Sequence, residues 1–156
     1  MARPTGLLIA QLLNRFMWFD GALQDNLDKR GWGGVRRLES MTMVYVHAGI
    51  TRPSELARLI GVTRQSMNTA LRELEEKKLV RLTPDPDDKR CKIVTFDPAG
   101  DAMRAEAQDV MEALEALLDE RLGKGAADKL SALLGADWGE APVLTAGDAR
   151  QKKDKR

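Results

Sequence analysis

The apolar and polar positions of this chain repeat mainly with the 3.6-residue period of an α-helix. A first long helix is predicted over residues 5–29, where apolar side chains recur at threes and fours or their multiples, at Leu8, Leu12, Phe16, Leu23 and Leu27. Glycines within the run 31–34 end this helix. A second helix ends at Gly49 and is marked by the positions Leu38, Met41, Tyr45 and Ala48.

Two further helices are predicted on either side of a short turn. Pro53 suits the first turn of a short helix over residues 54–60, and Gly61 stops it. Thr63 can cap a longer helix that continues to Lys78. At helical spacing, the buried stripe of this longer helix would be Met67, Ala70, Leu71 and Leu74.

The pattern changes to β-structure in residues 79–96. Two β-rich segments, 79–83 and 92–96, flank a polar turn with the sequence PDPDDKR. This arrangement predicts a hairpin with a long tip that ends in two cations. A short helix, a turn, a second helix and a basic hairpin together indicate a winged helix-turn-helix, which is a fold that reads DNA.

A helical pattern resumes after the hairpin. Asp97 can cap it, with Pro98 at the first helical position, and apolar side chains then run down one long helix to Leu122. A break at residues 123–125 precedes a last short helix, about 126–134. The helices at both ends of the chain are more apolar than one small winged domain requires, which favours an interface shared by two chains.

The predicted fold is therefore mainly α with a small β-wing. A winged helix-turn-helix core over about 35–97 would carry N- and C-terminal dimerisation helices at about 5–29 and 98–137. We expect one domain over residues 1–144. The remaining residues, 145–156, have almost nothing to bury and predict a disordered basic tail.

The outward face of the second helix of the helix-turn-helix is rich in hydrogen-bonding side chains. Arginine can chelate guanine, and glutamine or asparagine can chelate adenine, each with about 1–3 kcal/mol of discrimination. An ordinary solvated face would look similar, but the turn before this helix and the hairpin after it favour DNA contact. The candidate DNA-binding residues on this helix are Arg64, Gln65, Ser66, Asn68, Thr69 and Arg72.

The hairpin tip offers a second candidate contact. Asp88 precedes Arg90 by two residues and can orient its guanidinium through a charge-assisted hydrogen bond. An oriented arginine on a narrow hairpin suits the minor groove, where negative potential is concentrated. Lys92 could bind an adjacent phosphate. The alternative is a solvated turn, whose acidic residues simply favour a tight bend.

The distribution of charge says more than its total. The net charge is +1, but residues 51–96 carry 10 Lys and Arg against 7 Asp and Glu, whereas residues 97–122 carry 2 against 8. A local basic patch, rather than the whole protein, would therefore meet phosphate.

Other classes of protein find little support in this sequence. With one histidine, one cysteine and no phosphate loop, nucleophile elbow or metal-ligand spacing, we expect neither an enzyme nor a cofactor or metal site. The apolar run 6–13 is too short to span a bilayer and no small-residue cleavage site follows it, so we expect a cytoplasmic protein without a membrane partner.

Residues 51–100 resemble the core of the MarR family of transcriptional regulators. The matching pieces are SELA at 54–57, the GV turn at 61–62, LRELEEKKLV at 71–80, and DPDDKR at 85–90 with the family's Asp-x-Arg wing pattern. The helical patterns on both sides are similar to the family's dimerisation arms. The resemblance implies a homodimer on double-stranded DNA with a pseudo-palindromic operator, and often a repressor relieved by a small ligand.

Three positions depart from the family pattern. Lys78 replaces a glycine that ends the helix in a left-handed conformation, which implies a small backbone penalty. Thr69 stands where a basic residue is frequent, so affinity or base preference would differ. Phe96-Asp97 replaces a leucine-threonine pair, and Asp97 still provides a cap.

The resemblance also implies a ligand pocket between the first two helices and the long fifth one. A small aromatic or phenolic effector could meet Trp18, Tyr45 and His47 there, although the residues themselves favour a place for these side chains in the core or the dimer interface. Alternatives remain: a winged helix that binds proteins rather than DNA, a regulator of the PadR type, or a redox sensor. The redox sensor would use Cys91, since its basic neighbours favour a thiolate.

Overall fold

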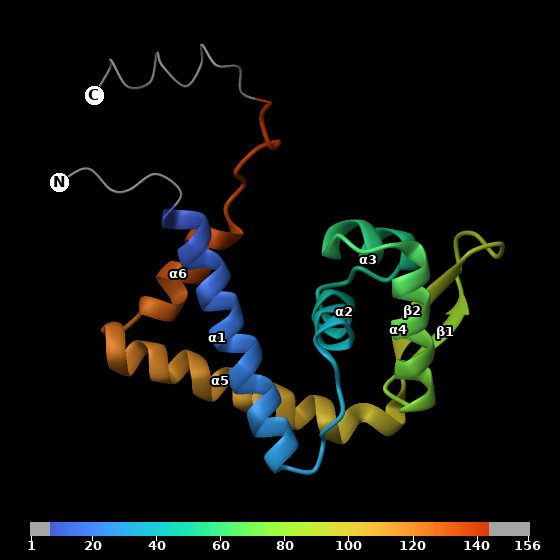
Figure 1. The fold of residues 1–156 in the computed structure, drawn as a ribbon, viewed down its shortest axis with the longest axis horizontal. Helices are drawn as coiled ribbons and strands as arrows, with labels where there is room; N and C mark the ends of the chain where they lie inside the picture. The colour runs from blue at the N-terminus through green and yellow to red at the C-terminus, as the bar shows by residue number, and fades with distance from the viewer. Residues whose placement is uncertain (1–6, 144–156) are drawn as a thin grey trace. The chain divides into compact units, whose positions relative to one another are not determined.

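The structure is a computed structural model that describes residues 7–143. The elements lie in the order α1 (Leu7–Lys29), α2 (Arg37–His47), α3 (Pro53–Ile60), α4 (Arg64–Glu76), β1 (Val80–Pro84), β2 (Lys92–Phe96), the short 3₁₀ helix η1 (Pro98–Gly100), α5 (Asp101–Leu122) and α6 (Ala126–Gly135) (Figure 1). The chain divides at Leu114 into two compact units. The predicted fold class, mainly α with a small β-wing, is confirmed.

The predicted boundaries hold closely for most elements. The C-terminal arm, expected over 98–137, consists of η1, α5 and α6, with the expected break after Leu122. The single domain over 1–144 stays a prediction. The expected tail, 145–156, lies outside the described residues.

Helices α3 and α4 form the helix-turn-helix, and a left-handed glycine makes the turn between them. Gly61 has φ 78°, a conformation that strains any residue with a side chain, and it ends α3. The Thr63 hydroxyl then caps α4 by accepting a hydrogen bond from the Ser66 amide at 3.1 Å. The predicted inner stripe of α4 is confirmed, because its buried residues are Met67, Ala70, Leu71 and Leu74.

The wing is an antiparallel hairpin in which Val80 lies opposite Phe96. Strand β1 begins one residue later than expected, because Leu79 still donates its amide to the Leu74 carbonyl of α4 at 2.9 Å. The Val94 amide of β2 donates to the Thr51 carbonyl at 2.8 Å, which joins the hairpin to the segment before α3. The tip of the hairpin projects beyond α3 and α4 (Figure 1).

The residue between α4 and the wing adopts the backbone conformation that the resemblance implied. Lys78 has φ 56°, and among the residues from 7 to 143 no other side-chain-bearing residue has a positive φ. A lysine in this region costs roughly 1 kcal/mol relative to glycine. The expected left-handed end of the helix is therefore confirmed, with a lysine in it.

The core of the first unit joins α1 to α2 and α5. Leu23 and Leu27 of α1 pack in one cluster with Val46 of α2 and with Met103 and Val110 of α5. The N-terminal half of α1 differs, because most of its large apolar side chains are exposed. The same unit therefore contains a closed core and an open apolar face.

The inner face of α2 differs from the face that its apolar residues indicated. Its buried residues are mostly polar: Glu39, Ser40, Thr42 and Val46. Leu38, Met41 and Tyr45 are only half-buried. Hydrophobicity could not reveal this face, because the polar side chains on it find partners inside the protein.

The second unit contains the end of α5 and helix α6. Asp119 accepts hydrogen bonds from the Gly125 amide at 2.8 Å and the Ala127 amide at 2.9 Å. These amides, led by that of Ala127, lower the pKa of the Asp119 carboxyl. The side chain thus closes the turn between the two helices and caps α6.

Candidate nucleic-acid interface

The outward face of α4 presents a continuous polar surface. Arg64, Gln65, Asn68 and Arg72 are exposed, and Thr69 is half-buried. Ser66 is exposed as well, but its hydroxyl lies 2.9 Å from that of the capping Thr63. The structure thus brings the six predicted residues of this helix onto one surface, with Ser66 partly committed to the cap.

At the wing tip, Arg90 is paired with Asp88. The Arg90 Nε donates to Asp88 Oδ1 at 3.1 Å, and the Arg90 amide donates to the same oxygen at 3.1 Å. The side-chain bond from Arg90 is the main cause of the lowered pKa of Asp88. The Arg90 side chain remains 91% exposed, so its guanidinium is oriented by its own chain and is still open to a ligand.

A second pair, which sequence reasoning missed, holds the base of the wing. Asp85 is only 3% exposed and accepts hydrogen bonds from Arg52 Nε at 3.1 Å and Nη2 at 2.8 Å. The Asp87 amide also donates to Asp85, at 2.9 Å, and this bond is the first cause of its lowered pKa, ahead of Arg52. Arg52 lies before α3, so the pair joins the wing to the helix-turn-helix. Its partners are 33 residues apart, and no local spacing indicates it.

The remaining wing residues are exposed. Lys92 begins β2 and faces solvent. Cys91 is exposed, and its Sγ lies 3.7 Å from Asp88 Oδ2. The redox alternative stays a prediction. Residues 7–143 contain no group of three or more His, Cys, Asp and Glu side chains that could hold a metal ion.

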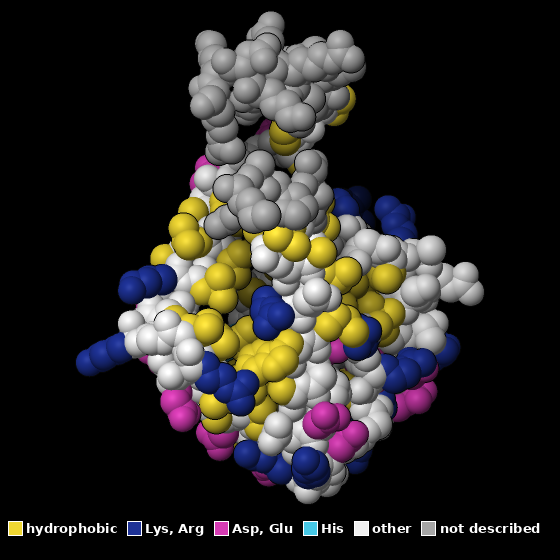
Figure 2. Space-filling model, turned by 60° about the vertical axis from the view of Figure 1, so that its left-hand side comes forward, with side chains coloured by type: hydrophobic (Ala, Val, Ile, Leu, Met, Phe, Trp, Pro, Cys, Tyr) yellow, Lys and Arg dark blue, Asp and Glu magenta, His cyan; other side chains and the backbone are white. Residues whose placement is uncertain are grey.

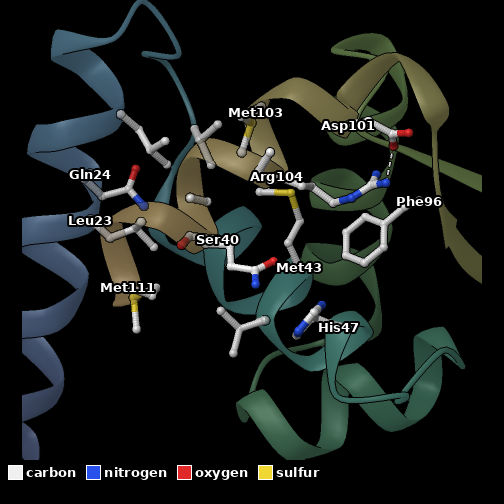
Figure 3. A pocket seen from close by; sticks show the side chains of 16 residues that line it. Leu23, Gln24, Ser40, Met43, His47, Phe96, Asp101, Met103, Arg104 and Met111 are labelled. Carbon is white, nitrogen blue, oxygen red and sulfur yellow. Dashed lines mark hydrogen bonds and ion pairs between the residues drawn. The ribbon is translucent and has the colours of Figure 1, made fainter. Parts of the chain in front are cut away.

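A cavity of about 540 Å³ lies between α1, α2 and α5 in the first unit (Figure 3). Its wall is mainly apolar and includes Leu23 of α1 and three methionines, Met43, Met103 and Met111. The Gln24 side chain also lines it, and the buried Gln24 Nε2 has no hydrogen-bond partner among the described residues. A buried donor without a partner is costly.

Of the three predicted effector residues, one lines the cavity and two do not. His47 lines the cavity (Figure 3). Trp18 and Tyr45 do not line it: both pack against the core, and Trp18 meets Phe19 edge-on with ring centroids 4.9 Å apart. Gln24 was not identified from the sequence, because a lone glutamine on an amphipathic helix carries no signal.

Arg104, another residue of the cavity wall, already has partners within the chain for its guanidinium. Its guanidinium lies 4.4 Å from the centre of the Phe96 ring, donates to the Asp97 carbonyl at 3.1 Å and pairs with Asp101. Arg104 was likewise not singled out from the sequence. With its charge balanced, it does not supply a free cation for an anionic ligand.

Residues 34–90 match a family model described as the MarR family. Among solved structures, the chain is similar to wild-type apo MarR from E. coli, with 21% identity, a TM-score of 0.63 and 86% of this chain and 96% of that chain covered. It is similar to the transcriptional regulator PA4135, with 22% identity, a TM-score of 0.66 and 85% and 95% covered.

The fold is also similar to that of the F27L mutant of S. aureus MepR, solved bound to an oligodeoxyribonucleotide. Here the identity is 18% and the TM-score 0.53, over 86% of this chain and 95% of that chain. No protein with a curated description matches the chain. Within residues 7–143, the structure contains no helix of sufficient length and hydropathy to cross a membrane.

Proposed function

We propose that the protein, whose residues 34–90 match the MarR family of winged-helix regulators, is a sequence-specific repressor that binds a pseudo-palindromic operator as a homodimer. The observation that carries this proposal is the exposed, internally oriented Arg90 at the tip of the wing. It lies on the same compact unit as the polar face of α4. Two such elements match two grooves of one DNA half-site.

The residues of the interface divide into two roles. Gln65 and Asn68 face outward from α4 and can form paired hydrogen bonds with base edges in the major groove, together with Arg64, Ser66 and Thr69. Arg72 and Lys92 are exposed cations suited to phosphates. Arg90, held by Asp88, enters the minor groove. This division follows from chemistry, since phosphate contacts carry charge but no sequence information.

The dimer would form through the apolar faces at the ends of the chain. Large apolar side chains on the N-terminal half of α1 are exposed, including Leu8 at 61% and Leu13 at 59%. The same holds for α6, where Leu133 is 69% exposed. Figure 2 shows apolar side chains lying open on the surface between scattered cations. Soluble monomers rarely expose such faces, and a second copy of the chain offers the matching surface.

Selection of bound sequences from a random DNA pool tests the proposal. We expect a recovered palindrome whose half-sites lie about one helical turn, roughly 34 Å, apart. Single-base variants of that operator then separate the two roles. Gln65→Ala and Asn68→Ala should change the preferred bases, whereas Arg72→Ala and Lys92→Ala should weaken binding to all sequences alike.

A pool from which no sequence is enriched would contradict the regulator. The same binding profile for all four variants would contradict only the division of roles. A single recovered half-site without a symmetric partner would contradict the homodimer on DNA.

The cavity supports response to a small effector. Its apolar wall and unpaired Gln24 Nε2 suit an aromatic molecule that carries an acceptor oxygen, as a phenol or an aromatic ketone does. The three methionines can adapt to the shape of such a ring. Since Arg104 already pairs with Asp101, a neutral ligand fits better than a carboxylate.

Acetophenone and ethylbenzene are a matched pair for this test, since only acetophenone has an acceptor. Acetophenone should raise the melting temperature more than ethylbenzene does and should release operator DNA. Gln24→Leu should remove the difference between the two molecules. Equal responses to both molecules in the unaltered protein would contradict the role of Gln24.

A further inference from the structure

The buried carboxylate of Glu39 is not used by any of the contacts proposed so far. Its side chain, in the first turn of α2, has no exposed surface. It accepts a hydrogen bond from the Arg36 amide at 2.6 Å, which caps α2. A carboxylate in such a place is costly unless charged and hydrogen-bonded partners surround it.

The partner of Glu39 comes from the far end of the recognition helix. Lys77 is the residue that caps the C-terminus of α4, and its Nζ lies 2.7 Å from both carboxylate oxygens of Glu39. The same Nζ donates to the Gly34 carbonyl at 2.7 Å. The ammonium group thus has three acceptors, two on Glu39 and one on the segment between α1 and α2.

A second ion pair also joins the start of α2 to the end of α4. Arg36, the residue before α2, pairs with Glu73 in the last turn of α4. Two polar links therefore tie the start of α2 to the end of α4. The opposite, N-terminal end of α4 carries Arg64 and Gln65, and a helix held at one end transmits a small rotation along its whole length.

We infer that Glu39 and Lys77 are positioning residues, which set the orientation of α4 and thereby the base specificity of the protein. This inference rests on the proposed DNA-reading role of α4. Apolar packing through Met67, Leu71 and Leu74 holds the helix in place but tolerates small rotations, because dispersion contacts are weakly directional. An ammonium group between three fixed oxygens defines both a distance and a direction.

The inference predicts that replacing both members of the ion pair changes specificity for DNA more than it changes stability. Replacing both members of such a pair by apolar residues of similar volume is often neutral or stabilising. The variant Glu39→Met/Lys77→Met should therefore remain folded with a melting temperature close to that of the unaltered protein, since the loss of the acceptor for the Arg36 amide offsets part of the gain. Its preference for the selected operator over unrelated DNA should fall by at least about tenfold. A purely structural pair would not lower specificity in a protein that remains stable.

Lys78→Met is the matched control. Lys78 is the exposed neighbour of Lys77, so its removal takes away the same charge at the same end of α4 without touching Glu39. This control should weaken binding to operator and unrelated DNA equally, since only a phosphate attraction is lost. If this double variant does not fold, Glu39→Gln/Lys77→Met, which keeps an acceptor for the Arg36 amide and leaves no unpaired charge, carries the same test.

Residual dipolar couplings of the backbone amides provide a readout that needs no DNA. Couplings in α4 should change relative to those in α2 in the double variant, and should match the unaltered protein in the control. Unchanged couplings, or an unchanged preference for operator DNA, would overturn the inference. If the unaltered protein selects no operator at all, the proposed function fails, while the couplings still decide whether the pair orients α4.

Discussion

The winged region and the N-terminal half of α1 use similar leucines in opposite ways. Leu71 of α4 has no exposed surface, whereas Leu13 of α1 is 59% exposed. Both residues lie on amphipathic helices of the same unit. The winged region buries its apolar stripe within its own chain, and α1 leaves half of its stripe open. The difference supports the proposal that the winged region is complete in one chain, whereas the open face of α1 would be covered by a second copy.

The largest expected effect follows from this contrast. Leu71→Ala should destabilise the chain by about 2–5 kcal/mol, because it removes buried methyl groups and leaves a cavity. Leu13→Ala, measured at a concentration that favours the monomer, should change the free energy of unfolding by less than about 0.5 kcal/mol. Urea unfolding followed by circular dichroism measures both. Equal losses would mean that α1 is buried within its own chain.

The arm itself is tested by adding charge to its open face. Phe16 is 39% exposed, and Phe16→Glu should weaken dimerisation by at least about 2 kcal/mol, or roughly thirtyfold, if this face is the centre of the interface. Sedimentation velocity over a concentration series measures the dissociation constant. The control Asp25→Gln alters an exposed position in the half of α1 that contains the buried Leu23 and Leu27, and it should not change the dissociation constant of the dimer. A monomeric unaltered protein at micromolar concentration would remove the basis of this prediction.

A smaller effect separates two neighbouring cations of the wing. Arg90→Ala should weaken operator binding by about 1–3 kcal/mol, as expected for an oriented contact. Lys89→Ala should cost less, because a free ammonium group offers only a screened point charge. Fluorescence anisotropy at about 0.15 M salt, where the screening length is about 8 Å, measures both.

The sign of the Asp88→Ala effect sharpens the same test. Simple electrostatics predicts tighter binding, because a negative charge is removed near DNA. Loss of the bond from Arg90 Nε to Asp88 predicts weaker binding, because the guanidinium is no longer oriented. We expect weaker binding. Tighter binding would show that the hairpin is merely a basic loop.

The smallest effect concerns the stability of the winged region in acid. Arg81 Nε donates to Asp97 Oδ2 at 2.7 Å, and this bond is the main cause of the lowered pKa of Asp97, about 2. Since the unfolded chain has the ordinary value of 3.8, the pair stabilises the fold fully above about pH 4. This contribution is lost as the pH falls through about 2.

Arg81→Met should therefore have a lower urea midpoint than the unaltered protein at pH 5. The difference between the two midpoints should become smaller as the pH falls towards 2. The expected change is a small one, because the Arg81 side chain is 55% exposed and solvent screens the pair. A constant difference between the two proteins across this range would mean that the pair does not titrate with folding.

Local sequence patterns were sufficient to predict the elements of the winged region. The stripe of α4, the turn at Gly61 and the pairing of Asp88 with Arg90 all depend on residues within a few positions of each other. Helical and β-periods, caps and short turns act over that range, so they can be read from the order of residues. The left-handed Lys78, in contrast, was implied by the family resemblance, since the family usually has a glycine at this position.

Contacts between distant segments required the tertiary structure. The bond from Lys77 to Glu39 spans 38 residues and that from Arg52 to Asp85 spans 33, and their carboxylates look like ordinary surface acids in the sequence. The place of Gln24 in the cavity wall depends on how α1 packs near α2 and α5. Burial decides what a polar side chain does, and burial depends on which elements meet. A periodic pattern predicts each helix but does not state what lies against it.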